Sequence, residues 1–399
     1  MSQKRILFLG GSSAQIPIIN EAKQRGMYVI TCDYLPNNPG HKLADEYHNI
    51  STIDHEGILN LAKRINVDFV VAYASDPAAP TAAYVSEILG LPGNSYKSVR
   101  ILTAKDLFRE FQTKNGFNAP KAISIYPNDL VYEKVNILQF PIIVKPTDSS
   151  GSKGVIKVDK LINIQPAINY AFSFSRNNRI IAEEFIDNEI ADLHGDGFVI
   201  DGNLVFSCLG DHIYNSKSNP FNPIGTLWPS KIDHNIIVKA NNDVARLIKL
   251  VGFKNGPINI EARVNREGML YIMEIGPRSG GHFVPNAIKY CTGFNMVKAT
   301  IDLQIGEEIL LPKNKKKYSA YYAINSDEDG VLEQLKISVE LKQYVREFHQ
   351  YVKLGEKVKS FQGANYAIGI VLLVFNEREE MDYYISNISR FISIEIEKS

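Results

Sequence analysis

Two glutamates in the segment 256–281 have the spacing of a shared cation site. This segment, GPINIEARVNREGMLYIMEIGPRSGG, predicts a β-hairpin with strands Ile258–Val264 and Met269–Ile275. Glu261 and Glu274 are then diagonal neighbours about 7–8 Å apart. Two carboxylates that converge on a sheet repel each other unless a cation or a proton lies between them. Mg²⁺ is commonly held by one or two carboxylates together with phosphate oxygens, so a metal site is one interpretation of this hairpin.

The register of this hairpin decides which side chains share a face. A four-residue turn makes Val264 face Met269 and Asn259 face Glu274. A turn one residue longer or shorter would put the two glutamates on opposite faces. The alternative to a metal site is a solvated face on which Arg263 neutralises a glutamate. Because side chains alternate along a strand, we expect one apolar face that packs on a core. Its members are Ile258, Ile260, Ala262, Val264, Met269, Tyr271, Met273 and Ile275.

A lysine and the loop after it suit a polyphosphate. The apolar run 140–144 leads to Lys145, and the segment 147–154 reads TDSSGSKG. Small residues allow successive backbone N–H groups to turn inward and form an anion-binding concavity. Lys153 adds a positive charge and the serine hydroxyls add donors. Taken alone, such a loop is more often a generic flexible turn.

The segment 180–186, IIAEEFI, predicts a strand that ends where the chain crosses over. Such an edge can offer backbone N–H and C=O groups to an adenine ring, and Glu189 could accept hydrogen bonds from ribose hydroxyls. The alternative is a half-buried strand that carries two exposed glutamates, Glu183 and Glu184.

The N-terminal region predicts an open parallel sheet. Strands at 4–9, 28–32 and 69–73 alternate with helical patterns, the second of them near 54–65. Ligands of such sheets bind at the carboxyl ends of the strands. The candidate rim residues are therefore Gly10–Ser13, Asp33 and Asp76; loop glycines and helix caps are the alternative. The chain has neither GxxxxGK[ST] nor GxGxxG, which argues against a P-loop and an N-terminal dinucleotide site.

One long helix is expected at 97–114, and it ends at Gly116. Lys105 and Arg109 lie one turn apart on the same face, where solvent exposure is the usual outcome. A β-rich region begins near Ala119, and 314–399 form a third, small region. Its expected elements are strands at Tyr318–Ile324 and 366–375, a helix at Glu377–Phe391 and a strand at Ile392–Ile396.

The composition is that of an ordinary globular protein. The 399 residues carry 44 basic and 44 acidic side chains, so no charge bias towards nucleic acid or membrane exists. Three scattered cysteines, without metal-ligand spacing, fit a reducing compartment rather than a disulfide framework. The longest apolar run has ten residues, too few to span a membrane, and the first residues do not form a signal peptide. We expect a cytoplasmic protein.

The order of these motifs resembles the ATP-grasp superfamily, specifically its carboxylate–amine (amino-acid) ligase branch. The resemblance covers nearly the whole chain: ILFLGG, GLPG, FPIIVKP, SSGSKGV, EEFI and GPINIE…MEIGPRSGG occur in the family's order. It implies an α/β and α+β fold in three parts. These are an N-terminal open parallel-sheet (pre-ATP-grasp) domain at 1–116, a two-lobed ATP-grasp domain at 117–312 and a small C-terminal α+β lobe at 313–399. ATP and Mg²⁺, with Mn²⁺ as a substitute, are the implied cofactors.

The resemblance also implies roles for individual residues. Lys105 and Lys145 would contact the ATP phosphates, and Arg278 would grip the transferred phosphoryl group or the substrate carboxylate. Glu261 and Glu274 would bridge the metal, and Glu189 would bind the ribose. The phosphate-covering loop would be Ser149, Ser150, Gly151, Ser152, Lys153 and Gly154, and the adenine hinge Glu183, Glu184, Phe185 and Ile186.

The acceptor side is less specified. His282 could orient a substrate or take a proton from the amine, with a structural hydrogen bond as the alternative. Asp76, His212, Trp228, Arg278 and Gly281 are the candidate substrate residues, although core packing would equally explain Trp228. Asp211 and Tyr214 lie with His212 and Trp228 in the loop-rich segment 210–230. In related ligases this segment lines the substrate pocket.

One departure from the family is Gly276, where an Asn usually helps to hold a second metal. Water, substrate or Asn259 would have to substitute, or one metal site is weaker. The implied reaction is ADP-forming: a small carboxylate, an amino acid in the preferred interpretation, is joined to an amine through an acyl phosphate. A purine-pathway or carboxylase-type enzyme and a non-catalytic ATP-binding protein are the alternatives. Few basic residues occur near Gly10, Asp33 and Asp76, which disfavours a phosphoribosyl substrate. The expected partners are small molecules and, by analogy with relatives, a second copy of the chain.

Overall fold

The N-terminal part of the chain forms the parallel sheet that the sequence predicts. The computed structural model describes residues 3–149, 151–214, 222–312 and 317–398. Four parallel strands are ordered β3-β2-β1-β4, and their carboxyl ends lie at one edge. They are β1 (Arg5–Leu9), β2 (Tyr28–Cys32), β3 (Glu46–His48) and β4 (Phe69–Val71). The helices α1 (Ile16–Gln24) and α2 (His55–Ile65) lie between these strands in the chain, and α3 (Ala79–Leu89) follows β4. α10 (Met296–Ile305) packs against α1 although it comes from much later in the chain.

The single long helix expected at 97–114 is wrong, because the chain breaks it into two. α4 (Tyr96–Thr103) ends at Ala104, whose backbone is extended, and α5 (Lys105–Lys114) begins at the next residue. The break turns Lys105 into the first residue of a new helix. Arg109 is not exposed as expected: only 4% of its surface is accessible, because α5 turns this face into the protein.

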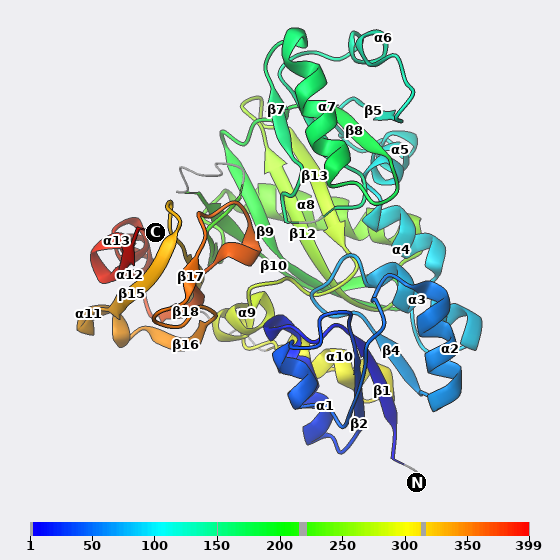
Figure 1. Ribbon diagram of the computed structural model, residues 1–399, viewed down its shortest axis with the longest axis vertical. Coiled ribbons are helices and arrows are strands. Elements are labelled where there is room, and N and C mark those ends of the chain that lie inside the picture. The colour runs from blue at the N-terminus through cyan, green and yellow to red at the C-terminus, as the bar shows by residue number, and fades with distance from the viewer. Residues whose placement is uncertain (1–2, 150, 215–221, 313–316, 399) are drawn as a thin grey trace.

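A small four-stranded sheet forms a separate lobe at the top of Figure 1. Its strands are ordered β5-β8-β6-β7, and α6 (Val131–Val135) and α7 (Ile164–Ser173) accompany them. They are β5 (Ala122–Ile125), β6 (Ile142–Pro146), β7 (Ile156–Val158) and β8 (Ile180–Glu184). Lys145 therefore lies in β6 and Glu183 lies beside it in β8.

An eight-stranded sheet runs through the centre of the molecule in the order β13-β12-β9-β10-β11-β14-β18-β16 (Figure 1). Its first five strands are β9 (Ala191–Ile200), β10 (Asn203–Ile213), β11 (Gly225–Trp228), β12 (Gly256–Val264) and β13 (Leu270–Gly276). α8 (His234–Val251) packs on β10 and β13, while α9 (Val284–Thr292) packs on β9, β14 and β18. The sheet thus carries the paired glutamates at one of its edges.

The C-terminal region contributes the other three strands of that sheet. They are β14 (Tyr318–Ile324), β16 (Val345–Gln350) and β18 (Gly369–Phe375). β14 pairs with β11, so the large sheet continues across the boundary expected at 312/313. A second sheet, ordered β17-β15-β19, lies on the same side together with α11 (Val339–Lys342), α12 (Arg378–Ser386) and α13 (Ile388–Phe391). Its strands are β15 (Gly330–Ile337), β17 (Lys357–Val358) and β19 (Ile392–Glu397).

The hairpin of β12 and β13 exists, but its register differs from the expected one. Val264 pairs with Leu270 instead of Met269, and a bulge makes Met273 an extra residue in β13. Leu270 and Ile272 therefore join the core face, whereas Met269 is 41% exposed. The bulge shifts the chain back by one residue, so that Glu274 returns to the polar face. No turn residue encodes such a bulge, which explains the error.

No helix in the described part of the chain is long and apolar enough to cross a membrane.

Candidate active site

Glu261 and Glu274 face each other directly across β12 and β13. This is closer than the diagonal arrangement expected from the sequence, since directly opposed residues have Cβ atoms about 5 Å apart. Burial, the charge of Glu274 and the charge of Asp192 raise the pKa of Glu261 to about 8. Without a cation, one proton is therefore retained by this pair near neutral pH.

The oxygen donors at this position fit a magnesium ion. The described residues contain no group of three or more His, Cys, Asp or Glu side chains that could hold a metal by themselves. One or two carboxylates nevertheless suffice for Mg²⁺ when phosphate oxygens and water complete its octahedron. Glu261 and Glu274 would hold the ion, and phosphates would have to supply the rest.

Gly276, the departure from the family pattern, has a structural reason. Arg278 binds both carboxylate oxygens of Asp76, which follows β4 of the N-terminal sheet, and its Nε lies 2.7 Å from Oδ1. A Cβ at position 276 would lie 2.8 Å from the same Oδ1 atom and 3.2 Å from the guanidinium carbon. The ion pair passes so close to the backbone that only glycine fits there. Although burial disfavours its charge, Asp76 raises the pKa of Arg278.

Asn259, considered as a substitute for the missing Asn, lies directly opposite Gly276. Its amide nitrogen is committed to buried groups: it contacts Asp196 Oδ1 at 2.8 Å and His194 Nε2 at 3.0 Å. Burial raises the pKa of Asp196 to about 6, although its carboxylate accepts hydrogen bonds from Gly280 and Asn259. This cluster lies beside Glu261, on the same face of the sheet.

Lys145 lies in a buried ion triad that the sequence did not reveal. Its ammonium group binds Glu183, whose other oxygen accepts a 3.0 Å hydrogen bond from Arg109 Nε. Burial opposes ionisation, but Arg109 and Lys145 lower the pKa of Glu183 to about 2. Arg109 also donates to the carbonyl of Met273, the bulge residue, at 2.9 Å. A buried arginine cannot be recognised from a sequence when its partners are 74 and 164 residues away.

The side chain of Glu183 therefore points at Lys145 and Arg109 instead of lining the hinge. In the rest of the expected hinge, the N–H groups of Glu184 and Phe185 already donate to Lys121 and Pro141. The carbonyl of Ile186 accepts from Arg263. A ring bound at this edge would have to use the remaining backbone groups. Glu189, the expected ribose ligand, is 58% exposed and pairs with Arg266 at 2.7 Å.

The expected phosphate loop lies next to Lys105. Lys105 Nζ donates to the carbonyl of Ser149 at 2.6 Å. Gly151, Ser152 and Gly154 all have positive φ angles, between 57° and 72°, which bend the loop sharply. Ser150 lies outside the described residues, and Lys153 forms no ion pair with any residue that the structure describes. Gly363, from the C-terminal region, lies against this loop: its Cβ would be 3.2 Å from the carbonyl oxygen of Gly151.

The candidate substrate residue His212 lies on the large sheet beside His194, which the sequence did not indicate. His194 and His212 stack with ring centroids 4.4 Å apart, and both contact the hydroxyl of Thr226. Burial and the nearby His212 lower the pKa of His282 to about 4, so its imidazole is neutral at pH 7. His282 follows Gly281, has a φ of 52°, and its Nδ1 is buried without a hydrogen-bond partner among the described residues. A neutral, unpartnered nitrogen is free to accept a proton or a hydrogen bond.

Three other candidates serve the structure. Trp228 is fully buried, and its indole N–H donates to the carbonyl of His194. It therefore packs in the core, and the expectation that it lines the substrate pocket is wrong. Tyr214 donates to Asp192 at 2.7 Å, and Asp211 accepts from the N–H group of Lys231 at 2.9 Å. Of the N-terminal rim residues, Ser12 caps a short helical turn, while Asp33 binds Leu35 and Asn38.

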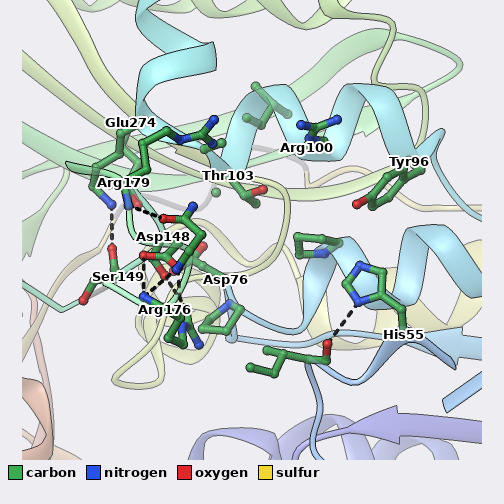
Figure 2. Close-up of a pocket in the computed structure, with 18 of the residues that line it drawn as sticks. His55, Asp76, Tyr96, Arg100, Thr103, Asp148, Ser149, Arg176, Arg179 and Glu274 are labelled. Atoms are coloured by element: carbon green, nitrogen blue, oxygen red, sulfur yellow. Dashed lines mark hydrogen bonds and ion pairs between the residues drawn. The ribbon is translucent and has the colours of Figure 1, made fainter. Parts of the chain in front are cut away.

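A cavity of about 540 Å³ joins several of these groups (Figure 2). Glu274 and Gly276 of the hairpin, Lys105 of α5, Ser149 of the phosphate loop and Asp76 line it. Three arginines that the sequence did not connect with the site also line it: Arg100, Arg176 and Arg179. The expectation of few basic residues near Asp76 is therefore wrong, because these arginines come from distant parts of the chain.

Comparisons with known proteins agree with this arrangement. Residues 138–286 match the family model of the ATP-grasp domain. The formate-dependent phosphoribosylglycinamide formyltransferase of Prochlorococcus marinus (strain CCMP1986 / NIES-2087 / MED4) is 29% identical over 188 residues, which are 46% of this chain and 48% of that protein. The chain thus spans about half the length of the curated relatives it matches.

Two crystal structures resemble the whole chain. An L-amino acid ligase from Bacillus licheniformis has a TM-score of 0.84 at 21% identity and covers 100% of both chains. A phosphoribosylglycinamide synthetase from Anaerococcus prevotii has a TM-score of 0.79 at 20% identity, over 99% of this chain and 100% of that one. The fold is therefore an ATP-grasp fold with a parallel-sheet N-terminal part. Residues 138–286 are the part of the chain that matches the ATP-grasp domain model itself.

Proposed function

We propose that the protein is an ATP- and Mg²⁺-dependent, ADP-forming carbon–nitrogen ligase. The observation that carries this proposal is the direct opposition of Glu261 and Glu274. Glu274 lines a cavity together with Lys105 and Asp76, the partner of Arg278. Carboxylates in this position bind a metal–phosphate complex, and the lysine and arginine provide positive charge beside it. The names of the relatives, which are a formyltransferase, a synthetase and a ligase, support the same class of reaction.

The proposed reaction has two steps. A carboxylate oxygen attacks the γ-phosphorus of ATP, the bond from this phosphorus to the bridging oxygen breaks, and ADP leaves. The nitrogen of an amine then attacks the acyl carbon, inorganic phosphate leaves, and the nitrogen loses a proton. A bound magnesium ion would neutralise charge on the phosphates.

The residues of the chain have separate tasks in this scheme. Lys145 and Lys105 would bind phosphate oxygens, and Glu183 with Arg109 would hold the Lys145 ammonium group in place. Arg278, oriented by Asp76, would bind the transferred group with its remaining N–H donors. His282, neutral at pH 7, would accept the proton from the amine. The Ser149–Gly154 loop would exclude water from the acyl phosphate.

The carboxylate and the amine remain to be assigned. An amino-acid substrate is the first candidate, supported by the similarity to the L-amino acid ligase. An enzyme acting on a phosphorylated amine is the second, and the three arginines at the cavity favour it together with the sequence relatives. Both candidates use the same ATP chemistry and differ only in what the cavity holds.

Trapping with hydroxylamine tests the proposal. The protein is incubated with MgATP, hydroxylamine and a panel of carboxylates that includes formate, bicarbonate and amino acids, and ADP and hydroxamates are measured. A hydroxamate that requires both ATP and one carboxylate supports the acyl phosphate and identifies the carboxylate. Nucleotide binding without ADP release for any carboxylate would instead favour a protein that binds ATP without catalysis.

A further inference from the structure

One wall of the cavity is formed by a single face of α4. Tyr96, Arg100 and Thr103 recur at helical spacing and line the cavity, whereas Val99 and Ser98 of the same helix are buried on the other side. Figure 2 shows Arg100 and Tyr96 on this helix, with His55 beside Tyr96 and with Glu274 and Ser149 further along the cavity. Seven residues of helix separate Tyr96 from Thr103, so this wall is about 10 Å long.

Most of the charged side chains that line the cavity are paired within the protein, and Arg100 is the exception among the arginines. Asp76 is bound to Arg278, Asp148 accepts the N–H groups of Arg176 and Asn177, and Arg179 pairs with Asp106 at 3.0 Å. Arg100 has neither an ion pair nor a side-chain hydrogen bond within the described residues.

Arg100 is not required by the proposed ATP chemistry. Glu261 and Glu274 would hold the metal, and Lys105 and Lys145 would bind the phosphates. Lys105 begins the helix that follows α4, so Arg100 is one turn or more away from the phosphates. The hydroxyl of Tyr96 also has no hydrogen bond among the residues described, and the ring of His55 lies 5.8 Å from the ring of Tyr96. These groups form a polar end of the cavity without an assigned ligand.

We propose that this end of the cavity binds an anionic group, a carboxylate or a phosphate, of the amine substrate, and that Arg100 forms the ion pair with it. The inference rests on the proposed function, since it assigns the far end of the same substrate. An arginine fork can bind two oxygens of either group, and Tyr96 adds a third donor. The cavity volume of about 540 Å³ suits a substrate larger than a simple amine.

Binding of matched probe pairs tests the inference. O-phosphoethanolamine is compared with ethanolamine, and β-alanine with β-alaninamide, by calorimetry in the presence of MgADP. In the wild-type protein we expect each anionic probe to bind at least about tenfold more tightly than its neutral partner. The two pairs separate phosphate from carboxylate recognition. Equal binding within both pairs, or no binding of any probe, would overturn the inference.

Variants of α4 then locate the site. Arg100→Gln should remove the preference for the anionic probe, and Arg100→Lys should retain part of it. Lys97→Gln, which removes a charge from the exposed side of the same helix, is the matched control and should change nothing. An unchanged preference in Arg100→Gln would contradict the assignment.

The affinity for MgADP, measured in the same titrations, separates this inference from the proposed function. If Arg100→Gln weakens MgADP to the same extent as the probes, Arg100 belongs to the nucleotide site and the inference fails. If the wild-type protein binds no nucleotide, the proposed function itself fails.

Discussion

At the scale of single residues, the two opposed glutamates make the sharpest prediction. Glu274→Gln should lower ADP formation by a factor of about 10² or more, because it removes a charged ligand from the phosphoryl-transfer site. It should leave the unfolding temperature of the metal-free protein unchanged or higher, because it also removes repulsion with Glu261. Glu267→Gln, in the exposed turn of the same hairpin, should keep full activity. ADP release and thermal unfolding measure both effects, and an active Glu274→Gln enzyme would contradict the metal assignment.

The raised pKa of Glu261 predicts how stability depends on pH. The folded protein retains this proton up to about pH 8, whereas the unfolded chain releases it near pH 4.5. The stabilising contribution is therefore complete below pH 4.5 and is lost as the pH rises towards 8. Without metal, the free energy of unfolding should fall by about 2 kcal/mol between pH 6 and pH 8 from this group. In urea titrations with EDTA, the unfolding free energy of Glu261→Gln should lack this pH-dependent component. An identical dependence of unfolding free energy on pH in the wild-type protein and the variant would contradict the assignment.

The sequence predicts a residue's position well when its partners lie close to it along the chain. Strand alternation predicted that Glu261 and Glu274 share a face, although the expected register was wrong and the bulge at Met273 is what brings them together. Arg278 was indicated only by the resemblance to the ATP-grasp superfamily. Arg109 was misjudged as exposed and Arg100 was not noticed, because their surroundings come from distant segments. Gly276 was recognised as unusual, but its reason, the pair of Asp76 and Arg278, exists only after folding.

At the scale of elements, α5 links the bulge of β13 to Lys145. Arg109 contacts Glu183 on one side and Met273 on the other, while Gln112 donates to Ile272 at 2.7 Å. Neither the break at Ala104 nor the bulge at Met273 is encoded by a Gly or Pro, so local sequence patterns could not predict them. Both come from tertiary contacts, which override helix and strand propensity.

Arg109→Met should therefore affect both stability and catalysis. It breaks a buried ion triad and should cost about 3–5 kcal/mol of unfolding free energy. The Michaelis constant for ATP should rise, because Glu183 then binds Lys145 alone and competes with phosphate for it. Lys114→Met, on the exposed side of α5 with 70% of its side chain accessible, is the control. Urea unfolding and steady-state kinetics provide the two measurements, and a stable variant with an unchanged Michaelis constant would refute this role.

At the scale of the whole molecule, the central sheet joins regions that the sequence separates. The parallel N-terminal sheet, the small lobe and the last strand of the chain were expected near their observed places. The continuation of the sheet from β11 into β14 was not, because strand pairing over about 90 residues leaves no mark in local patterns.

Truncation after Pro312 should therefore not yield a folded ATP-grasp domain. It removes β14, β16 and β18 and exposes the edge of β11 together with buried residues such as Phe283 and Trp228. Truncation after Phe391 removes only β19 and should leave the central sheet cooperative. Circular dichroism and limited proteolysis distinguish these outcomes; a compact, cooperatively unfolding chain ending at residue 312 would refute the dependence on β14.

The carbonyl oxygen of Gly151 lies 3.2 Å from where a Cβ at position 363 would be, and this closeness has a kinetic consequence. If the loop must swing away before ADP and product escape, the C-terminal region limits how far and how fast it swings, although it meets neither molecule. Gly363→Ala would press a methyl group against that oxygen and hold the loop elsewhere. The steady-state rate of this variant should change while the rate of the first turnover stays the same. Residue 363 would then influence product release although it takes no part in the chemical step.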